Sequence, residues 1–320
     1  MKHIKEKQKH MASRIIDVAD IDCIYLSYDE PQKEAFWIKI QNMVPWAKRV
    51  DGVKGSDAAH KAAAAKSDTE FFVLIDGDNL PDGDFFNLQL AVGEDEADAA
   101  WRWKARNHIN GLMYGNGGMS VWSKRFVEDM KTHEASDGSD RTAVEFCFEP
   151  KYFAMHNCYS TTYPNGSPYQ AWRAGFREGV KMCLDKGRKP TLQEFDDSVQ
   201  RRNFDNLCIW QTVGRDVENG IWAIAGARLG TTMTMIHEWD HRRVQDFDEL
   251  KAIWEGMVEG RDPEEIAARE GQLLRSRLGM PIAEFDAEQS RFFKHHYATG
   301  HKNLDMMTKE IDVIRRIEGW

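Results

Sequence analysis

The chain has 320 residues, 42% of them hydrophobic, and a formal net charge of −9. Its hydrophobic content excludes a disordered chain, and its length suits one large α/β domain with an appendage, or two small domains. The acidic balance argues against a protein that depends on non-specific DNA contact, because neutralising phosphates needs a basic surface.

The cysteines and apolar runs bear on the cellular compartment. Five cysteines are scattered along the chain without a CxxC pair, which predicts reduced thiols. No apolar run reaches the roughly 18 residues of a bilayer-spanning helix, and the charged N-terminus lacks the apolar region of a signal peptide. We therefore expect a cytoplasmic protein with no membrane partner. No feature of the sequence specifies an oligomeric state.

Strand and helix patterns alternate over the first 90 residues, which predicts a doubly wound α/β sheet. The apolar run before Asp76 is continuous, as in a parallel strand buried on both faces. The expected elements are a strand over Asp22–Ser27, a helix over 32–44, a weak strand over Ala47–Val53, a helix over Ser56–Lys66 and a strand over Glu70–Ile75.

The rest of the chain changes from a mixed to a helical pattern. Strands are expected over Ala99–Trp103, Leu112–Trp122, Glu145–Phe148 and Tyr152–Thr161, and helices over Phe126–Thr132 and Tyr169–Leu184. From about residue 190 the pattern is helical. We expect a flexible N-terminus over 1–14, an α/β domain over 15–240 and a helical C-terminal extension over 241–320.

Two polar segments follow predicted strands, Ser27–Asp29 and Asp76–Asp78. Open α/β sheets bind ligands at the carboxyl ends of their strands, so both segments are expected in one site. Asp76 and Asp78 can direct carboxylates at one point, while Gly77 lets the chain turn tightly. Carboxylate oxygens suit Mg²⁺ or Mn²⁺, either of which bridges the oxygens of a diphosphate. An ordinary acidic turn is the competing interpretation.

The segment from Gly52 to Asn79 (GVKGSDAAHKAAAAKSDTEFFVLIDGDN) resembles the segment around the DXD motif of GT-A glycosyltransferases, family 2 in particular. The resemblance implies a GT-A fold, which is a Rossmann-like mixed α/β sheet flanked by helices. It also implies a nucleotide-sugar donor, with a UDP-sugar favoured, and a divalent cation. By resemblance, Asp76, Gly77 and Asp78 hold the cation and the donor diphosphate.

The same resemblance implies further donor contacts. In the family, the Gly-rich turn, here with Gly55, leads to a helix that touches the nucleotide. His60 stands where the family often has Asn, so His60 or Lys61 is expected near the diphosphate. The loop after the first strand carries the nucleoside, which implies that Ser27, Tyr28 and Asp29 contact the base and ribose. A helix-surface position is the alternative for His60.

The family also implies an acceptor-side segment and a catalytic base. The YGNGG segment resembles the strand whose small residues let donor sugar and acceptor approach, which assigns this role to Tyr114, Asn116, Gly117 and Gly118. A glycine pair needed for a β-bulge is the alternative. The acidic motif that opens a later helix in the family is absent here, where the opening is Asn165–Pro168. Glu145 and Asp140 are the nearest substitutes for a general base. A late histidine often completes the metal site, and His237 and His156 are the candidates.

The chain as a whole, with YGNGG and PNGSPYQAWRAGFREGVKM, resembles glycosyltransferases carried by tailed bacteriophages. Some of these glycosylate 5-hydroxymethyl pyrimidines in phage DNA, which implies a DNA acceptor in the cytoplasm of the bacterial host. A stacking role for Trp101, Trp103, Tyr169 or Trp172 and phosphate contacts for Arg173 and Arg177 are then expected.

Four other functions fit parts of the pattern. The acceptor could be a soluble or cell-surface glycan, with the donor site unchanged. A nucleotidyltransferase would usually carry a Gly-rich basic loop after the first strand, where this chain has Ser27–Pro31. A non-catalytic nucleic-acid-binding or virion protein would use Asp76 and Asp78 only as a turn. A two-metal nuclease would need further acids on neighbouring strands, and these are not evident.

Overall fold

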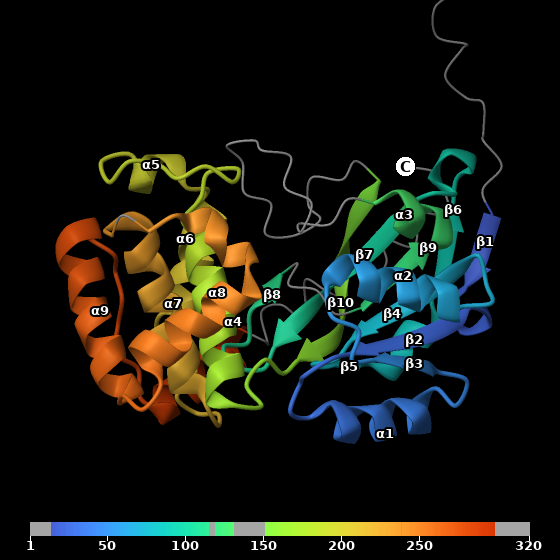
Figure 1. Cartoon of the computed structure of the whole chain (residues 1–320), viewed down its shortest axis with the longest axis horizontal. Coiled ribbons are helices and arrows are strands. Elements are labelled where there is room, and N and C mark those ends of the chain that lie inside the picture. Colours follow the sequence, from blue (N-terminus) through green and yellow to red (C-terminus); the bar gives the residue numbers. More distant parts are fainter. Residues whose placement is uncertain (1–13, 115–118, 131–150, 238, 298–320) are drawn as a thin grey trace, which may run out of the picture.

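The computed structural model describes residues 14–114, 119–130, 151–237 and 239–297. Within these ranges the chain forms a sheet-based body and a helical body that lie side by side (Figure 1). The strands are β1 Arg14–Asp17, β2 Asp22–Ser27, β3 Lys48–Asp51, β4 Phe71–Asp76, β5 Asn79–Pro81, β6 Gln89–Val92, β7 Ala100–Asn107, β8 Met113–Tyr114, β9 Met119–Ser123 and β10 Tyr152–Thr162.

The main sheet is mixed, with strand order β3-β2-β4-β9-β7-β10-β5, and β8 pairs with β7. Strands β3, β2 and β4 run parallel, whereas β9 runs antiparallel to both β4 and β7. β10 is parallel to β7, and the short β5 closes the sheet antiparallel to β10. β1 and β6 form a separate antiparallel pair. The expected α/β class with a mixed sheet is confirmed.

Helices cover both faces of this sheet (Figure 1). One face packs against α1 (Lys33–Met43), which contributes Phe36 and Ile40 to a core that includes Trp101. The other packs against α2 (Ser56–Lys66) and α3 (Lys124–Asp129). Side chains alternate across a strand, so the continuous apolar run of β4 supplies both cores at once.

The helical body begins at α4, well before residue 241. It contains α4 Pro168–Met182, α5 Phe195–Ser198, α6 Arg201–Trp210, α7 Gly220–Met235, α8 Phe247–Ile253 and α9 Pro263–Leu278, with a π-helical turn at Trp254–Val258. Apolar side chains of α4, α6, α7 and α9 share one core with Ile109, Leu112 and Tyr114 of the β7–β8 region. The boundary expected at residue 241 therefore falls inside a packed helical unit.

Most elements expected from the sequence are present with small shifts at their ends. The expected Leu112–Trp122 strand is divided into β8 and β9, with residues 115–118 outside the described ranges. The expected strand at Glu145–Phe148 and most of the N-terminal segment 1–14 also lie outside them. Among the described residues, no helix combines the length and apolarity needed to cross a membrane.

Candidate functional site

Three parallel strands deliver acidic and polar residues to one edge of the sheet. In the register, Ser27 lies opposite Asp51, and Leu26 lies opposite Asp76. The carboxyl ends of β2, β3 and β4 therefore meet at a common edge, as the sequence predicts for Ser27–Asp29 and Asp76–Asp78. Asp51 joins them there, although its strand pattern was weak and gave no reason to single it out.

The Asp76–Asp78 turn is held from two sides through its main chain. The Tyr25 hydroxyl donates to the Gly77 carbonyl at 2.7 Å. The Tyr163 backbone N–H donates to the Asp78 carbonyl at 2.7 Å. These two bonds satisfy the carbonyls of Gly77 and Asp78 and so hold the backbone of the turn.

Glu30 brings another carboxylate against the same turn. A Cβ placed on Gly77 would lie 2.4 Å from the Glu30 carboxyl carbon, so glycine is required for this approach. The backbone N–H of Tyr28 donates to Glu30 Oε2 at 2.7 Å, which holds the side chain in place. Glu30 was not singled out from the sequence because it stood in an apparent turn before Pro31.

The crowding of carboxylates shows in the pKa of Asp78. Burial, followed by the charge of Glu30, raises that pKa, whereas Arg173 acts in the opposite direction, and the net result is a pKa of about 6. An ionised Asp78 is thus unfavourable in this arrangement unless positive charge is added. A divalent cation would supply that charge, and Mg²⁺ commonly binds through one or two carboxylates together with substrate phosphates.

A second charged cluster surrounds Ser27 and changes its expected role. Ser27 is buried, and its hydroxyl donates to Asp51 Oδ1 at 2.7 Å while accepting from Arg49 Nε at 3.0 Å. Lys33 donates to both Asp51 oxygens at 2.8 and 3.0 Å. Ser27 therefore positions Asp51 and is not placed for the expected contact with a base. Burial disfavours ionised Asp51, but hydrogen bonds from Lys33 and Ser27 outweigh it and lower the pKa.

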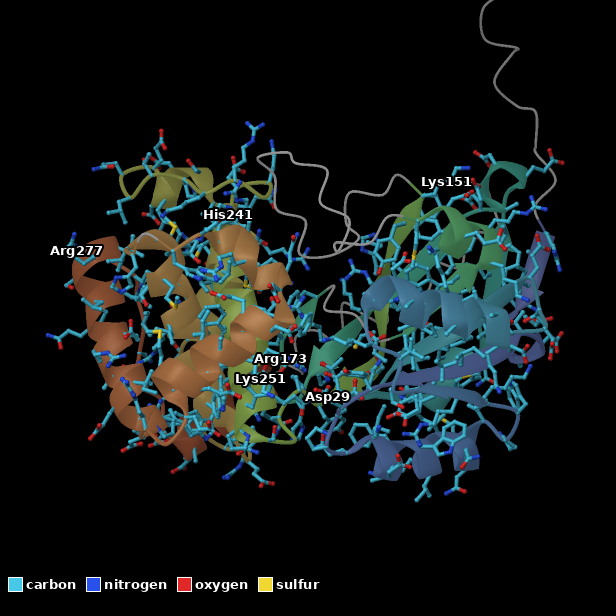
Figure 2. All side chains as sticks on the ribbon, viewed as in Figure 1. Asp29, Lys151, Arg173, His241, Lys251 and Arg277 are labelled. Atoms are coloured by element: carbon cyan, nitrogen blue, oxygen red, sulfur yellow. The ribbon has the colours of Figure 1, made fainter. Side chains whose placement is uncertain are left out.

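Tyr28 and Asp29 lie at the surface of this edge, as a nucleoside contact requires. Tyr28 is 43% exposed. Asp29 lies 3.9 Å from Arg173 of α4, measured between carboxylate oxygen and guanidinium nitrogen. Figure 2 shows the two side chains where the sheet-based and helical bodies meet. Arg173 is thus brought to the expected site from the helical body.

Gly55, His60 and Lys61 lie at and within α2. Gly55 adopts φ +94° and precedes the first helical residue. The His60 ring nitrogen Nδ1 lies 2.7 Å from the Ser56 carbonyl oxygen, and the ring packs against Trp122 with centroids 5.0 Å apart. Lys61 pairs with Asp57 one turn earlier. The contacts of His60 and Lys61 are thus helical and core contacts, while contact with a diphosphate stays a prediction.

The tryptophans expected to stack on a base are core residues. Trp101 and Trp172 are fully buried and Trp103 is 4% exposed, so none can meet a base. Trp101 and Trp103 point into the sheet core because β7 lies in the middle of the sheet, where apolar side chains are covered by helices. The expectation for Trp101 and Trp103 was wrong for that reason. Trp172 is covered by Phe176 and Trp254.

Tyr114 is also buried, so its side chain is not exposed for contact with the substrate that would accept the sugar. Its hydroxyl donates to Glu178 Oε2 at 2.7 Å and accepts from Trp210 Nε1 at 2.9 Å. These bonds tie β8 to α4 and α6. The same role was expected of three further residues that lie outside the described ranges: Asn116, Gly117 and Gly118. The candidate bases Asp140 and Glu145 also lie outside them.

The histidines proposed to complete the metal site are not gathered around it. His237 is exposed just after α7, and His156 is exposed on β10. Within the described ranges, no three His, Cys, Asp or Glu side chains are grouped as a metal site. Neither histidine therefore joins Asp76 and Asp78 in such a group, and metal binding by the two aspartates stays a prediction.

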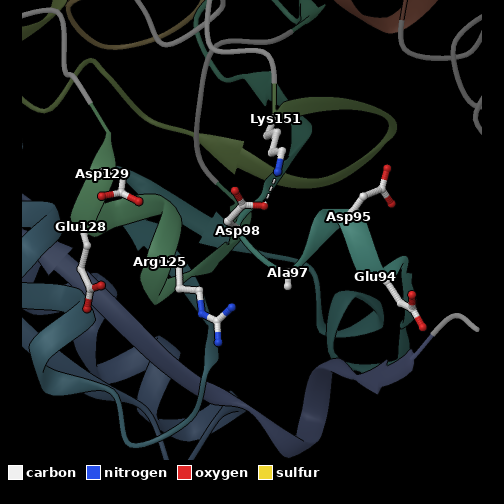
Figure 3. A pocket seen from close by; sticks show the side chains of 8 residues that line it. All are labelled: Glu94, Asp95, Ala97, Asp98, Arg125, Glu128, Asp129 and Lys151. Atoms are coloured by element: carbon white, nitrogen blue, oxygen red, sulfur yellow. Dashed lines mark hydrogen bonds and ion pairs between the residues drawn. The ribbon is translucent and has the colours of Figure 1, made fainter.

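An acidic depression lies at the other edge of the sheet, where β7 begins and β9 ends (Figure 3). Lys151 pairs there with Asp98. The depression is separate from the candidate site, because β4 delivers Asp76 to the opposite edge. Its lining residues are Glu94, Asp95, Ala97, Asp98, Arg125, Glu128, Asp129 and Lys151.

Comparisons with known proteins give little support for any family. No family model and no curated protein matches the chain. Among solved structures, HddC from Yersinia pseudotuberculosis is 18% identical over 48% of this chain and 76% of its own, with a TM-score of 0.26. HddC complexed with GMP-PN is 17% identical over 46% and 74%, with a TM-score of 0.25. Likeness at this level carries no argument about function.

Proposed function

We propose that this chain is a metal-dependent glycosyltransferase with a GT-A fold. It moves a sugar from a nucleotide-sugar to a hydroxyl group, and the acceptor we favour is a 5-hydroxymethyl pyrimidine in phage DNA. The observation that carries the proposal is the Asp76–Asp78 turn at the carboxyl edge of β4, where burial and the nearby Glu30 raise the pKa of Asp78 to about 6. Such crowding suits a site that receives a cation.

The acidic residues and Tyr28 at the carboxyl edge of the sheet have proposed roles in binding the metal and the donor. Asp76 and Asp78 bind Mg²⁺ or Mn²⁺, which when bound neutralises the diphosphate that the departing sugar leaves behind. Asp29 and Asp51 accept hydrogen bonds from the base and ribose of the donor, which we expect to be a UDP-sugar. Tyr28, exposed beside them, stacks on the base.

Tyr25, Lys33 and Arg49 prepare the site rather than contact the ligand. Tyr25 donates to the Gly77 carbonyl, which holds the backbone between the two aspartates. Lys33 and Arg49 hold Asp51 ionised through ion pairs at 2.8 and 3.2 Å. Because these charged groups are already in place, they need not reorient when negative charge develops on the diphosphate. Arg173, close to Asp29, would meet a phosphate of donor or acceptor.

A thermal-shift screen tests this proposal. UDP-, GDP-, CMP- and dTDP-sugars are each added with and without Mn²⁺. A donor at a hundredfold excess over its dissociation constant should add roughly 2.7 kcal/mol to the free energy of unfolding. We expect one nucleotide to stabilise the protein, and only with metal. Absence of any shift, or an equal shift without metal, would contradict the proposal.

A further inference from the structure

Phe247, the first residue of α8, is a large aromatic side chain left 41% exposed on the helical body. Two guanidinium groups from α4 lie against its ring. The guanidinium carbons of Arg173 and Arg177 are each 5.1 Å from the ring centroid. The sequence shows these two arginines one turn apart on α4, but gives no sign that an aromatic ring from α8 joins them.

This ring lies beside the candidate donor site. Arg173 reaches Asp29 in the loop after β2, at 3.9 Å. The next residue after Phe247, Asp248, pairs with Lys54 in the loop after β3 at 3.7 Å. Both neighbours of the ring therefore contact loops at the carboxyl edge of the sheet, which places Phe247 next to the edge that carries Asp78.

The acids that flank Phe247 already have partners. Asp246 accepts from the backbone N–H groups of Asp248 and Glu249 and so caps α8. Glu249 pairs with Arg243, and Asp248 with Lys54. The groups that lie against the ring itself are the guanidiniums of Arg177 and of Arg173, which also approaches Asp29. This local surface therefore offers an aromatic face together with guanidinium groups.

We propose that Phe247, Arg173 and Arg177 form a platform for single-stranded DNA, on which a base stacks while the arginines meet its phosphates. Aromatic faces bind bases with little sequence preference, and arginine adds cation–π and phosphate contacts. A base that receives a sugar must leave the duplex stack, so an unstacked strand needs a surface beside the donor. The assignment to the acceptor rests on the proposed glycosyltransferase function, whereas DNA binding itself is measured without it.

Fluorescence anisotropy with a labelled oligothymidine of roughly twelve nucleotides tests the platform on the full chain, without donor or metal. Phe247→Ala should raise the dissociation constant about tenfold, and Phe247→Trp should keep it near that of the wild type. Phe292→Ala is the matched control, since Phe292 is 66% exposed elsewhere on the helical body. It should bind as the wild type does.

The salt dependence of the same binding reports the phosphate contact. Arg177→Gln should lower the slope of log affinity against log salt by about 0.7, the value for one phosphate of a single strand. Thermal melts would show that each variant is folded. A wild-type protein that does not bind the oligomer would overturn the platform, as would unchanged binding by Phe247→Ala.

The donor nucleoside is the other ligand that could stack here, and the assay separates the two. If Phe247→Ala weakened binding of UDP with Mn²⁺ but not of the oligomer, the platform would belong to the donor and our assignment would be wrong. Failure of every nucleotide-sugar to bind would overturn the glycosyltransferase proposal alone, because the oligomer assay contains no donor.

Discussion

At the scale of one residue, the ionised form of Asp78 lowers the stability of the folded protein. Its carboxyl group is partly buried beside Glu30, and its pKa is raised to about 6 from an ordinary value of 3.8. In this range the folded protein keeps a proton that the unfolded chain has lost. The free energy of unfolding therefore falls as pH rises from about 4 to about 6, and stays lowered above that window.

Asp78→Asn removes this cost and should stabilise the protein at pH 8 while abolishing turnover. We expect a gain of about 2 kcal/mol in the free energy of unfolding at pH 8 and almost none at pH 4, measured by urea unfolding. Asp98→Asn is the control, because a hydrogen bond from Lys151 lowers the pKa of Asp98. It should lose up to about 1 kcal/mol at pH 8. A less stable Asp78→Asn at pH 8 would refute the account of this carboxyl group.

Gly77→Ala tests the close approach of Glu30. The new Cβ would overlap the Glu30 carboxylate, whose flexible side chain would move away and release the Tyr28 N–H. We expect metal-dependent nucleotide binding to weaken at least about tenfold, since small displacements of site groups are costly, with little change in melting temperature. Gly83→Ala, with open space around its Cβ position, should leave binding unchanged. Isothermal titration calorimetry measures both.

At the residue scale, the sequence predicted some residues of the candidate site and missed others. Asp76 and Asp78 were predicted because a buried strand ends directly on them, which is a local pattern. Glu30 and Asp51 were missed because their roles depend on partners distant in the chain. Trp101 and Trp103 were misplaced because the sequence of a strand does not reveal what covers its aromatic side chains. In the structure Trp101 packs against Phe71 and Phe153, and Trp103 packs against Phe85.

At the scale of elements, α4 and α7 pack against each other with their backbones in close approach. A Cβ on Gly175 would lie 2.0 Å from the Ala223 carbonyl oxygen, and one on Gly179 would lie 2.3 Å from that of Ala227. The reverse contacts use Gly226 and Gly230 against Trp172 and Phe176. The glycines therefore let the two backbones of α4 and α7 touch.

Gly175→Ala should separate these helices and cost about 3 kcal/mol, because the obstacle is backbone rather than a movable side chain. Thermal and urea unfolding measure the loss. Gly256→Ala is the matched control, since no atom lies within 4 Å of its Cβ position. Gly256→Ala should be neutral or stabilise by up to about 1 kcal/mol. Equal effects of the two substitutions would contradict the packing argument.

Helices and strands were mostly predictable, whereas their grouping was not. Periodicity marks an amphipathic stretch such as α4, but it does not say which helices share a core. The sequence placed a boundary at residue 241, where charge density rises. In the structure α4, α6, α7 and α9 share one core, because each buries an apolar face against another.

At the scale of the whole molecule, Arg228 ties distant segments of the helical body together. Its side chain is fully buried and donates to the carbonyls of Gln211 and Ala267 at 2.9 and 2.8 Å. It also pairs with Glu284 at 2.8 Å. One guanidinium thus joins the end of α6, α9 and the segment after α9 to α7.

Arg228→Met should cost about 3 to 5 kcal/mol in the free energy of unfolding, because several buried acceptors lose their donor at once. Arg242→Met removes an exposed pair with Asp240 and should change stability by less than about 1 kcal/mol. Urea unfolding compares the two variants. A mild effect of Arg228→Met would show that Arg228 does not hold these segments together.

The central claim is that Asp76 and Asp78 hold a divalent cation together with the diphosphate of a nucleotide-sugar. Titration of Mn²⁺ followed by electron paramagnetic resonance tests it directly, because the signal of free Mn²⁺ falls as the ion is bound. We expect a UDP-sugar to increase Mn²⁺ binding by the wild type and by Asp98→Asn, but not by Asp78→Asn. Nucleotide-dependent Mn²⁺ binding that persists in Asp78→Asn would place the cation elsewhere and contradict the account.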